Sequence, residues 1–333
     1  MPREITVDHP AVGAVHLYLS GGADSLVAAA ASVRRSKDAC WVTLAREHRL
    51  PVLLERPLAE VGRSIWLLGY SGTGNPLLPA ALEAHLTHRP VHWLSATTGR
   101  IRLAAAELPG MELQSMPGGS LVPLALEAWP GPWSDEDRAY ERLGFILGRY
   151  SGAKPSDFEL SLVNDLHAAS VQVRSEERAG AGLVRELAEH RVATWRGLKT
   201  LRTLAKRGEK RIRDSRQALL DHDPVFGGRH GPAVWIVESG LVARGAHGKA
   251  VAARSYARQA ACVLVERVAQ GWTKAWIVLP AHREGLWLSL MNEAARFSVD
   301  FSYTGLRGAG AVPAELVDEF AAAVWPLLDR EID

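Results

Sequence analysis

The chain has 333 residues, enough for about two domains, and its content of 47% hydrophobic and 23% charged residues is that of a folded globular protein. With 39 basic and 37 acidic residues the formal net charge is +2, so affinity for polyanions must come from local clusters of charge. The two cysteines lie in apolar stretches, and the sequence shows neither a signal peptide nor a run of 18 apolar residues. We therefore expect a cytoplasmic protein with no disulfide and no membrane partner.

The first third of the chain alternates short apolar runs with helix-like segments, which is typical of βα units in a parallel sheet. The predicted strands are Ala14–Leu19, Ala39–Leu44, Ser64–Leu68 and Pro90–Leu94. The predicted helices are Ser25–Arg35, Leu58–Val61 and Pro76–His85. Because parallel strands need right-handed crossovers and covered faces, residues 1–150 are predicted to form a doubly wound α/β domain with its functional loops at the carboxyl ends of the strands.

Helical periodicity replaces the strand pattern in the middle of the chain, most clearly over Ser134–Tyr150, Glu159–Ser170 and Gly182–Leu220. Residues 151–230 are therefore predicted to form a helical connector. Turn-forming residues at Asp221–Pro224 and Gly227–Pro232 place the start of the next domain there.

Residues 231–333 are predicted to form a smaller C-terminal α/β domain. Its predicted elements are a strand at Ala233–Glu238, a helix at Lys249–Ala269, strands at Ala275–Leu279 and Gly285–Met291, a glycine-rich loop at Gly305–Pro313 and a helix at Ala314–Leu328. The predicted fold class is thus α/β, with a doubly wound parallel-sheet domain, a helical linker and this second domain.

The sharpest motif is Ser20-Gly21-Gly22-Ala23-Asp24-Ser25, which follows a predicted strand and opens a predicted helix. Glycines permit a tight turn with outward-facing amides, the helix start is electropositive, and the serines add hydroxyl donors. This pattern predicts a phosphate-binding loop formed by Ser20, Gly21, Gly22 and Ser25. A plain strand-to-helix turn, capped by Asp24 or Ser25 and holding no ligand, explains the same residues.

The sequence resembles two protein families. The six residues from Ser20 to Ser25 resemble the Ser-Gly-Gly-x-Asp-Ser loop of PP-loop ATP pyrophosphatases, which adenylate their substrates. The order and spacing of elements over nearly the whole chain resemble the DHH phosphoesterase superfamily. Members of that superfamily join a doubly wound metal-binding domain through a helical linker to a smaller substrate-binding domain.

The DHH resemblance lies in architecture and not in metal ligands. The family's Asp-x-Asp-Gly motif corresponds to Gly22-Ala23-Asp24-Ser25, which keeps only the second aspartate. Where the family has an aspartate that ends a strand, this chain has Gly69, and where it has Asp-His-His, this chain has Ser95-Ala96-Thr97.

The C-terminal domain of the family carries a Gly-Gly-Gly-His loop that grips the phosphate or sugar of the substrate. The corresponding Gly305–Pro313 keeps glycines but lacks the histidine. The resemblance thus makes Gly308 and Gly310 further candidates for phosphate binding.

These departures bear on the chemistry that the resemblance implies. A two-metal phosphoesterase uses carboxylates and imidazoles to hold two ions about 3.5–4 Å apart and to generate hydroxide. Asp24 is the one recognisable candidate catalytic residue, and we assign no metal ligands. Degenerate members of the family act as scaffold or nucleic-acid-handling proteins, so the resemblance implies binding of a nucleotide or nucleic acid without a cofactor. Manganese or magnesium would be required only by an active phosphoesterase.

A stripe of basic residues is predicted on the last helix of the connector. The segment from Arg191 to Arg216 contains ten basic and two acidic residues, which gives a local net charge of 10 − 2 = +8. Five of the basic residues follow one another at steps of three or four, which places them on one side of a helix: Lys199, Arg202, Lys206, Lys210 and Arg213. We call these five residues the basic stripe. Such a face binds nucleic acid phosphates or is simply solvated.

The sequence leaves three functions open. The first is a DHH-like protein that binds nucleic acid or a nucleotide without hydrolysing it, with a protein partner or homodimer as an open question. The second is an ATP-using PP-loop enzyme. The third is a phosphoesterase with an unorthodox site, which requires acidic residues such as Asp24, Asp165 or Glu238 to converge.

Overall fold

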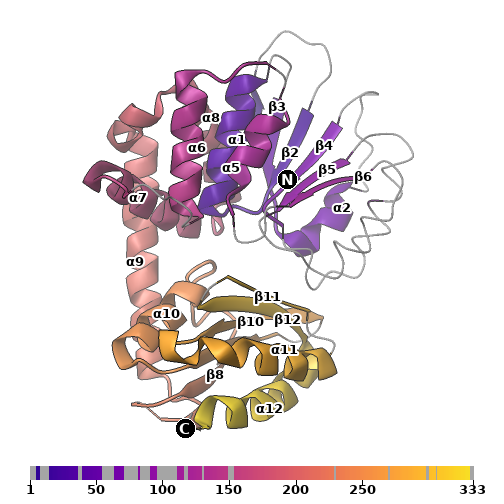
Figure 1. Ribbon diagram of the computed structural model, residues 1–333, viewed down its shortest axis with the longest axis vertical. Coiled ribbons are helices and arrows are strands. Elements are labelled where there is room, and N and C mark those ends of the chain that lie inside the picture. The colour runs from indigo at the N-terminus through magenta and orange to yellow at the C-terminus, as the bar shows by residue number, and fades with distance from the viewer. Residues whose placement is uncertain are drawn as a thin grey trace. The chain divides into compact units, whose positions relative to one another are not determined.

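The computed structural model describes residues 5–7, 15–36, 40–54, 64–70, 82, 91–95, 111–115, 119–129, 131–148, 154–228, 230–268, 271–297, 300–304 and 306–330. These residues form two compact units, unit 1 up to Glu209 and unit 2 from Lys210 onward. Each unit is built on its own six-stranded sheet with helices packed against it (Figure 1). The predicted α/β class, with a second and smaller α/β part, is confirmed.

The sheet of unit 1 has the strand order β1-β3-β2-β4-β5-β6. Strands β2 to β6 run parallel, and β1 pairs with β3 in the antiparallel sense. The strands are β1 (Ile5–Val7), β2 (Val15–Leu19), β3 (Cys40–Leu44), β4 (Ser64–Leu68), β5 (Val91–Ser95) and β6 (Met111–Ser115). Because β2 lies between β3 and β4, the strand order reverses at β2, and the carboxyl ends of β2 and β4 lie at the topological switch point.

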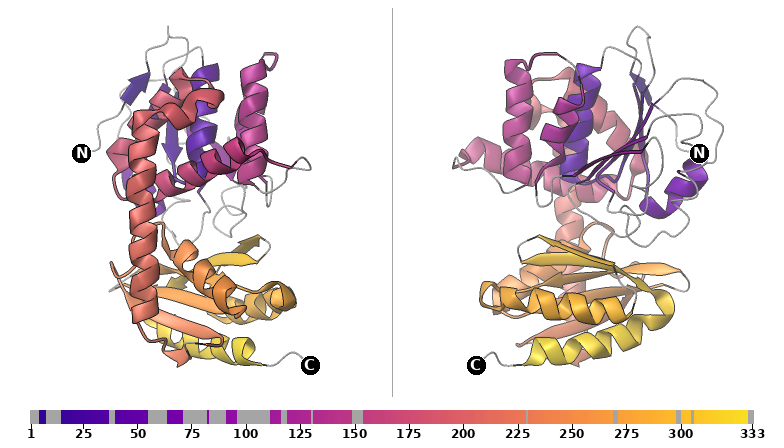
Figure 2. Two further views of the ribbon diagram at one scale, coloured as in Figure 1. Left: turned by 90° about the vertical axis from the view of Figure 1, so that its left-hand side faces the viewer. Right: turned by 45° about the vertical axis from the view of Figure 1, so that its right-hand side comes forward.

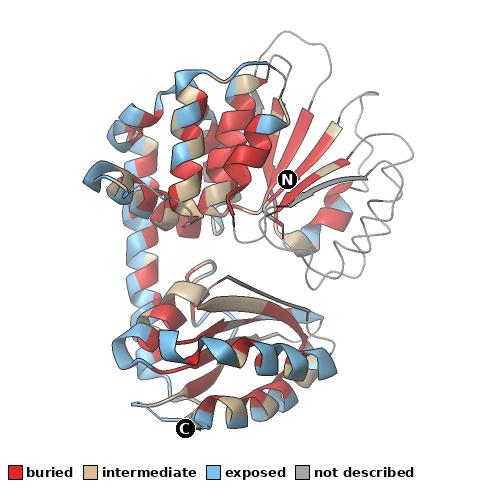
Figure 3. Cartoon of the chain, viewed as in Figure 1, coloured by how far each residue is buried: buried red, intermediate tan, exposed pale blue. Residues whose placement is uncertain are grey.

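Helices cover both faces of this sheet (Figure 1). On one face α1 (Ala23–Arg35) contacts α5 (Leu121–Glu127), α6 (Asp135–Leu147) and α8 (Glu177–Glu189). The small side chains of α1 let it lie between the sheet and these outer helices, and its middle is buried throughout (Figure 3). On the other face α2 (Leu50–Leu54) packs against Trp93 and Tyr18.

Two helices of unit 1 begin at capping boxes that the sequence encodes locally. At the start of α6, the Ser134 hydroxyl accepts a hydrogen bond from the Asp137 amide, while the Asp137 carboxylate accepts one from the Ser134 amide. Ser156 and Glu159 form the same pair of bonds before α7 (Asp157–Val173). Each box satisfies two amides that the helix itself leaves without acceptors.

The helix α9 (Lys199–Asp221) is uninterrupted, and the boundary between the units falls within it (Figure 2). Buried residues recur along it at steps of three and four, as a helix packed along one side requires: Leu201, Leu204, Gly208, Ile212, Ser215 and Leu219. A Cβ at Gly208 would overlap the carbonyl oxygen of Ala168 on α7. Glycine therefore allows the two helix backbones to approach closely, which fixes the face of α9 that is turned inward.

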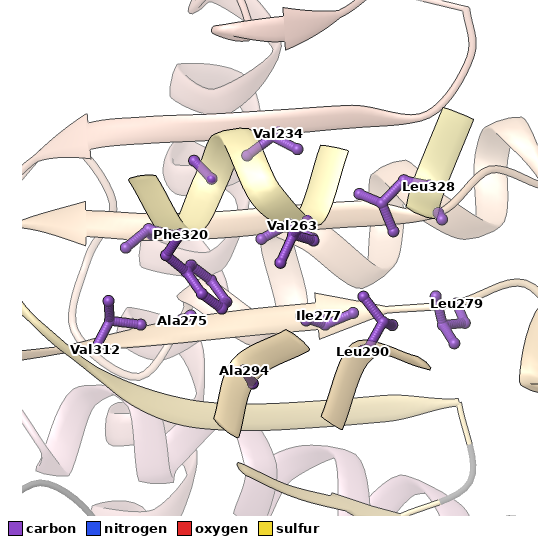
Figure 4. Packing of buried hydrophobic residues seen from close by; sticks show 14 of the residues in the cluster. Val234, Val263, Ala275, Ile277, Leu279, Leu290, Ala294, Val312, Phe320 and Leu328 are labelled. Atoms are coloured by element: carbon purple, nitrogen blue, oxygen red, sulfur yellow. The ribbon is translucent and has the colours of Figure 1, made fainter. Parts of the chain in front are cut away.

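Unit 2 has the strand order β11-β12-β10-β9-β8-β7, in which only the pair β8 and β9 is parallel among the described strands. The strands are β7 (Phe226–Gly227), β8 (Ala233–Glu238), β9 (Cys262–Arg267), β10 (Trp272–Val278), β11 (Asp300–Thr304) and β12 (Arg307–Pro313). The helices α11 (Trp287–Arg296) and α12 (Val317–Asp329) bury Leu290 and Phe320 against Val263 and Ile277 of the sheet (Figure 4). The helix α10 (His247–Arg258) contacts β9 and β10.

Three local predictions for the C-terminal part are wrong. The predicted helix Lys249–Ala269 ends at Arg258, because Gln259 adopts a left-handed conformation and the β-branched and apolar run that follows enters the sheet as β9. The predicted strand Gly285–Met291 is a 3₁₀ turn followed by α11, whose alternating Trp-Leu-Ser-Leu imitates a strand. The predicted loop Gly305–Pro313 is mostly β12, a strand paired on both sides.

Other predictions concern boundaries. The two units meet between Glu209 and Lys210, inside α9, and not in the turn-rich stretch after Asp221. The predicted helix Leu58–Val61, and all of Pro76–His85 except Leu82, lie outside the described residues. Across the described part of the chain, no helix combines the length and the hydropathy needed to span a bilayer.

The close packing at Gly208 predicts a specific stability defect. Although alanine favours helix by about 1 kcal/mol over glycine, Gly208→Ala should lower the free energy of unfolding by about 2 kcal/mol or more, because its methyl group meets the backbone of α7. Gly182→Ala on α8 is the matched control, because nothing lies within 4 Å of its Cβ position and the substitution should stabilise. Urea denaturation measures both variants, and equal midpoints would contradict this packing.

Candidate functional site

The loop Ser20–Gly22 joins β2 to α1 at the switch point of the sheet of unit 1. The Ser20 amide donates to the Leu68 carbonyl, and the Gly69 amide donates to the Leu94 carbonyl, so the ends of β2, β4 and β5 are held side by side. In open α/β sheets, ligands bind in the crevice outside these strand ends. The structure thus places the predicted loop where the fold binds ligands.

The loop is turned by Gly21, whose φ of +78° favours glycine. Gly22 is the N-cap of α1 and, having no side chain, provides no side-chain capping hydrogen bond. The Ser25 hydroxyl donates to the Gly22 carbonyl at 2.9 Å, and the Ser20 hydroxyl lies 3.4 Å from the Ser25 oxygen. The N-cap of α1 is thus Gly22 and not Asp24 or Ser25, while the Ser25 hydroxyl closes the turn by its bond to the Gly22 carbonyl.

Asp24 points away from the loop and instead binds the start of α5. One carboxylate oxygen accepts a hydrogen bond from the Ser120 hydroxyl at 2.5 Å, and the other accepts one from the Leu121 amide at 2.7 Å. Burial raises the pKa of the Asp24 carboxyl from 3.8 to about 6, and the bonds from Ser120 and Leu121 partly oppose that rise. Both oxygens of the candidate catalytic residue are thus engaged in joining two helices.

Gly69 and Ser95, which lie at the ends of β4 and β5, carry no carboxylate. Gly69 follows β4 with a φ of +76°, and a Cβ at this position would lie 2.8 Å from the Ser20 hydroxyl and 3.0 Å from Ser25 Cβ. The space that a longer side chain would need is filled by the serines of the loop. Ser95 ends β5 and is buried.

The donor set of the described residues does not fit a two-metal centre. Within these residues, no three His, Cys, Asp or Glu side chains lie close enough together to hold one ion. Of the other acids considered from the sequence, Asp165 lies 3.5 Å from Arg196 and Glu238 lies 3.8 Å from Arg267. Each therefore balances an arginine.

The structure also places the remaining candidates for phosphate binding. Gly308 and Gly310 lie on β12, where they pair with Ile277 and Ala275 of β10. Their backbones belong to a sheet ladder, so the loop geometry expected for them is wrong. Sequence reasoning missed Arg174, which follows α7 and lies over Gly21 and Gly22. No local sequence pattern predicts this contact, because about 150 residues separate Arg174 from the loop.

The five residues of the basic stripe are all exposed. At about 100° per residue, they lie on the side of α9 opposite its buried face. Among the described residues, no hydrogen-bond or ion-pair partner accompanies any of the five. Arg191, Arg196 and Arg207 pair with Glu136, Asp165 and Glu176.

Comparisons with known proteins identify the fold. No protein-family model matches the chain, and neither does any curated protein. The chain is similar to a RecJ structure in complex with Mn²⁺ from Thermus thermophilus, with a TM-score of 0.60 and 14% identity, over 96% of this chain and 52% of that one. It thus spans about half the length of that RecJ.

Two further structures resemble the chain over nearly its whole length. One is the DHH domain of a protein from a family of ribosomal proteins, with a TM-score of 0.58, 10% identity and coverage of 96% of this chain and 88% of that one. The other is PggH, a pGpG-specific phosphodiesterase from Vibrio cholerae, with a TM-score of 0.51, 9% identity and coverage of 95% and 99%. The chain therefore has the two-domain fold of DHH phosphoesterases, as its sequence predicted.

The raised pKa of Asp24 predicts a pH dependence of stability. The folded carboxyl binds its proton more tightly than the unfolded one, so this group's contribution to stability should fall as the pH rises from about 4 to about 6 and stay low above that. Asp24→Asn, which cannot ionise, should remove this fall. The free energy of unfolding of both proteins from pH 4 to pH 8 tests it, and parallel profiles would contradict it.

Proposed function

We propose that this protein is a DHH-fold binding protein that holds nucleic acid or a nucleotide without metal-dependent hydrolysis. The observation that carries the proposal is the basic stripe, in which five exposed cations have no acidic partner among the described residues. Of the acids nearby, Glu176 pairs with Arg207 on α9, while Glu136 and Asp165 pair with Arg191 and Arg196, which precede the helix.

The spacing of the stripe suits a polyanion. From Lys199 to Arg213 the helix rises by about 21 Å at about 1.5 Å per residue. Successive cations are therefore about 4.5–6 Å apart along the axis, which is close to the distance between phosphates on one nucleic acid strand. Each phosphate that is neutralised releases condensed counterions, so affinity accumulates along the stripe without base-specific contacts.

The absence of hydrolysis is supported by the geometry around Asp24. Both oxygens of Asp24 accept hydrogen bonds from the start of α5, which orient this carboxylate toward that helix. The glycine after β4 has no room for a carboxylate side chain beside Ser20. The pGpG-specific phosphodiesterase with the same fold favours a ligand of the nucleotide class for this chain as well.

Binding through the stripe predicts a change in salt dependence. Replacing Lys199, Arg202, Lys206 and Lys210 by glutamine should flatten the slope of log K against log salt for an oligo(dT) of about 30 nucleotides by up to about 3 units, at about 0.7 per phosphate contact. Fluorescence anisotropy between about 50 and 300 mM salt measures it.

The matched control removes four charges that are already paired. Arg185, Arg191, Arg196 and Arg207 lie within 4 Å of Glu189, Glu136, Asp165 and Glu176. Their replacement by glutamine makes the same change in net charge and should leave the slope within about 1 unit of the original. A slope that both variants share with the unmodified protein would show that the basic stripe does not bind the oligonucleotide.

The lack of catalysis is tested separately. With millimolar Mn²⁺, the protein should release no mononucleotides from the same oligonucleotide and no products from pGpG, because Asp24 is the sole match to the family's ligand positions. Chromatography of the reaction detects either product. Release that depends on manganese and disappears in Asp24→Ala would show an active phosphoesterase.

A further inference from the structure

The basic stripe occupies a narrow arc of α9. At about 100° per residue, its five residues fall within about 80° around the helix axis, from Arg202 at one edge to Lys210 at the other. They form one row of charge, about 21 Å long and one side chain wide, rather than a broad positive surface. A row of this shape restricts which nucleic acids can bind it.

Carboxylates border the row on both sides. Glu209 lies about 60° from the middle of the stripe on one side, and Asp214 lies about 80° from it on the other. Both side chains are exposed, and neither has a hydrogen-bond or ion-pair partner among the described residues. Their negative charges therefore act directly on any ligand that the stripe binds.

Two arginines share these flanks but give them no excess of positive charge. Arg207 lies on the side of Asp214, about two turns before it, and pairs with Glu176 at 3.7 Å. Arg216 lies on the side of Glu209, about two turns after it, and is exposed. Since one arginine is already paired and the other is offset by Glu209, the flanks add no positive charge to the row.

The charge pattern of α9 is unsuited to the major groove of a duplex. A helix in that groove lies between two strands, so phosphates line both of its flanks and base edges face its centre. A helix that binds there therefore needs cations or neutral donors on its flanks. On α9 the flanks carry Glu209 and Asp214, which the phosphates of the two groove walls would repel.

The outside of a duplex fits the row only in part. Each strand of a duplex winds around a stiff axis, so a straight row of about 21 Å reaches about three phosphates before the strand turns away. A single strand has no such fixed curvature and can place one phosphate against each cation. The row thus neutralises more phosphates on a single strand than on a duplex.

We propose that the basic stripe binds one single strand of nucleic acid along its length, and that Glu209 and Asp214 exclude duplexes. This statement rests on the proposed function, which it narrows to an unpaired strand. Because each of the five cations meets one phosphate, the strand covers about six nucleotides. The sequence of α9 contains no aromatic residue, so the strand is held by its phosphates and no base is preferred.

The experiment measures binding of labelled oligonucleotides to the full chain by fluorescence anisotropy at about 50 mM salt. For oligo(dT) strands of about 4 to 12 nucleotides, the affinity should rise steeply up to about six nucleotides and then only in proportion to the number of overlapping sites. A single strand of about 12 nucleotides of mixed sequence should bind at least about tenfold more tightly than its duplex, which offers about two fewer phosphate contacts.

Glu209→Gln combined with Asp214→Asn should reduce this preference to about threefold or less, because the repulsion of the groove walls is removed. Both side chains are exposed, so the variant should keep the fold. The matched control is Glu315→Gln combined with Glu319→Gln, which makes the same change in net charge outside α9 and should keep the preference. Glu315 and Glu319 are likewise exposed and have no ion-pair partner among the described residues.

The possible failures lead to different conclusions. Equal affinity for strand and duplex in the unmodified protein, or an affinity that keeps rising steeply beyond about eight nucleotides, would overturn the single-strand assignment while leaving the proposed function intact. A preference that survives the loss of Glu209 and Asp214, or that falls as far in the control, would overturn the role of these two acids. Absence of binding to either nucleic acid, or binding that removal of the basic stripe does not change, would overturn the proposed function and this assignment together.

Discussion

The hydrogen bonds that the Asp24 carboxylate accepts from Ser120 and Leu121 decide much of what unit 1 can do. They join α1, which opens at the ligand-binding edge of the sheet, to the first amide of α5. A free carboxylate at this edge can bind a metal ion, but one that satisfies the amide and hydroxyl at another helix start is an element of structure. The side chains of Ser20 and Ser25 fill the space beside Gly69 in which a second carboxylate would stand. Among the described residues at the ends of β2, β4 and β5, Asp24 is thus the one carboxylate, and α5 fixes its orientation.

A second constraint comes from the packing of α9. Gly208 brings the helix so close to Ala168 that only one rotation about its axis is compatible with the backbone of α7. Leu201, Leu204 and Ile212 are turned inward by that rotation, and the basic stripe is turned outward. Arg207, which is on the same helix outside the stripe, comes within reach of Glu176, whereas the five residues of the stripe have no such partner among the described residues. The unpaired charge is therefore a consequence of a backbone contact on the opposite side of the helix.

Much of this arrangement follows from local sequence patterns. Alternating apolar runs and glycine turns were enough to predict β2 to β5 of unit 1 and the loop Ser20–Ser25, and charge spacing was enough to predict the basic stripe, but the parallel edge strand β6 was not predicted. The local patterns failed where small residues are compatible with both a loop and a strand. The Gly-Ala repeat of β12 was predicted as a loop, but it is a strand because β10 and β11 pair with it on its two sides. They also failed for contacts between distant residues. Asp24 and Ser120 are 96 positions apart, and Arg174 is still farther from the glycines it covers, so neither contact leaves a local signal.

The basic stripe acts over a short distance. At physiological ionic strength charges are screened over about 8 Å, so the exposed cations of α9 act mainly on anions that are almost in contact with them. In the proposed function their contribution is spread over several weak contacts and carries no information about the end of a strand. Binding of this kind depends on the inward packing of Gly208, which turns the stripe outward, and it requires no chemistry at Asp24.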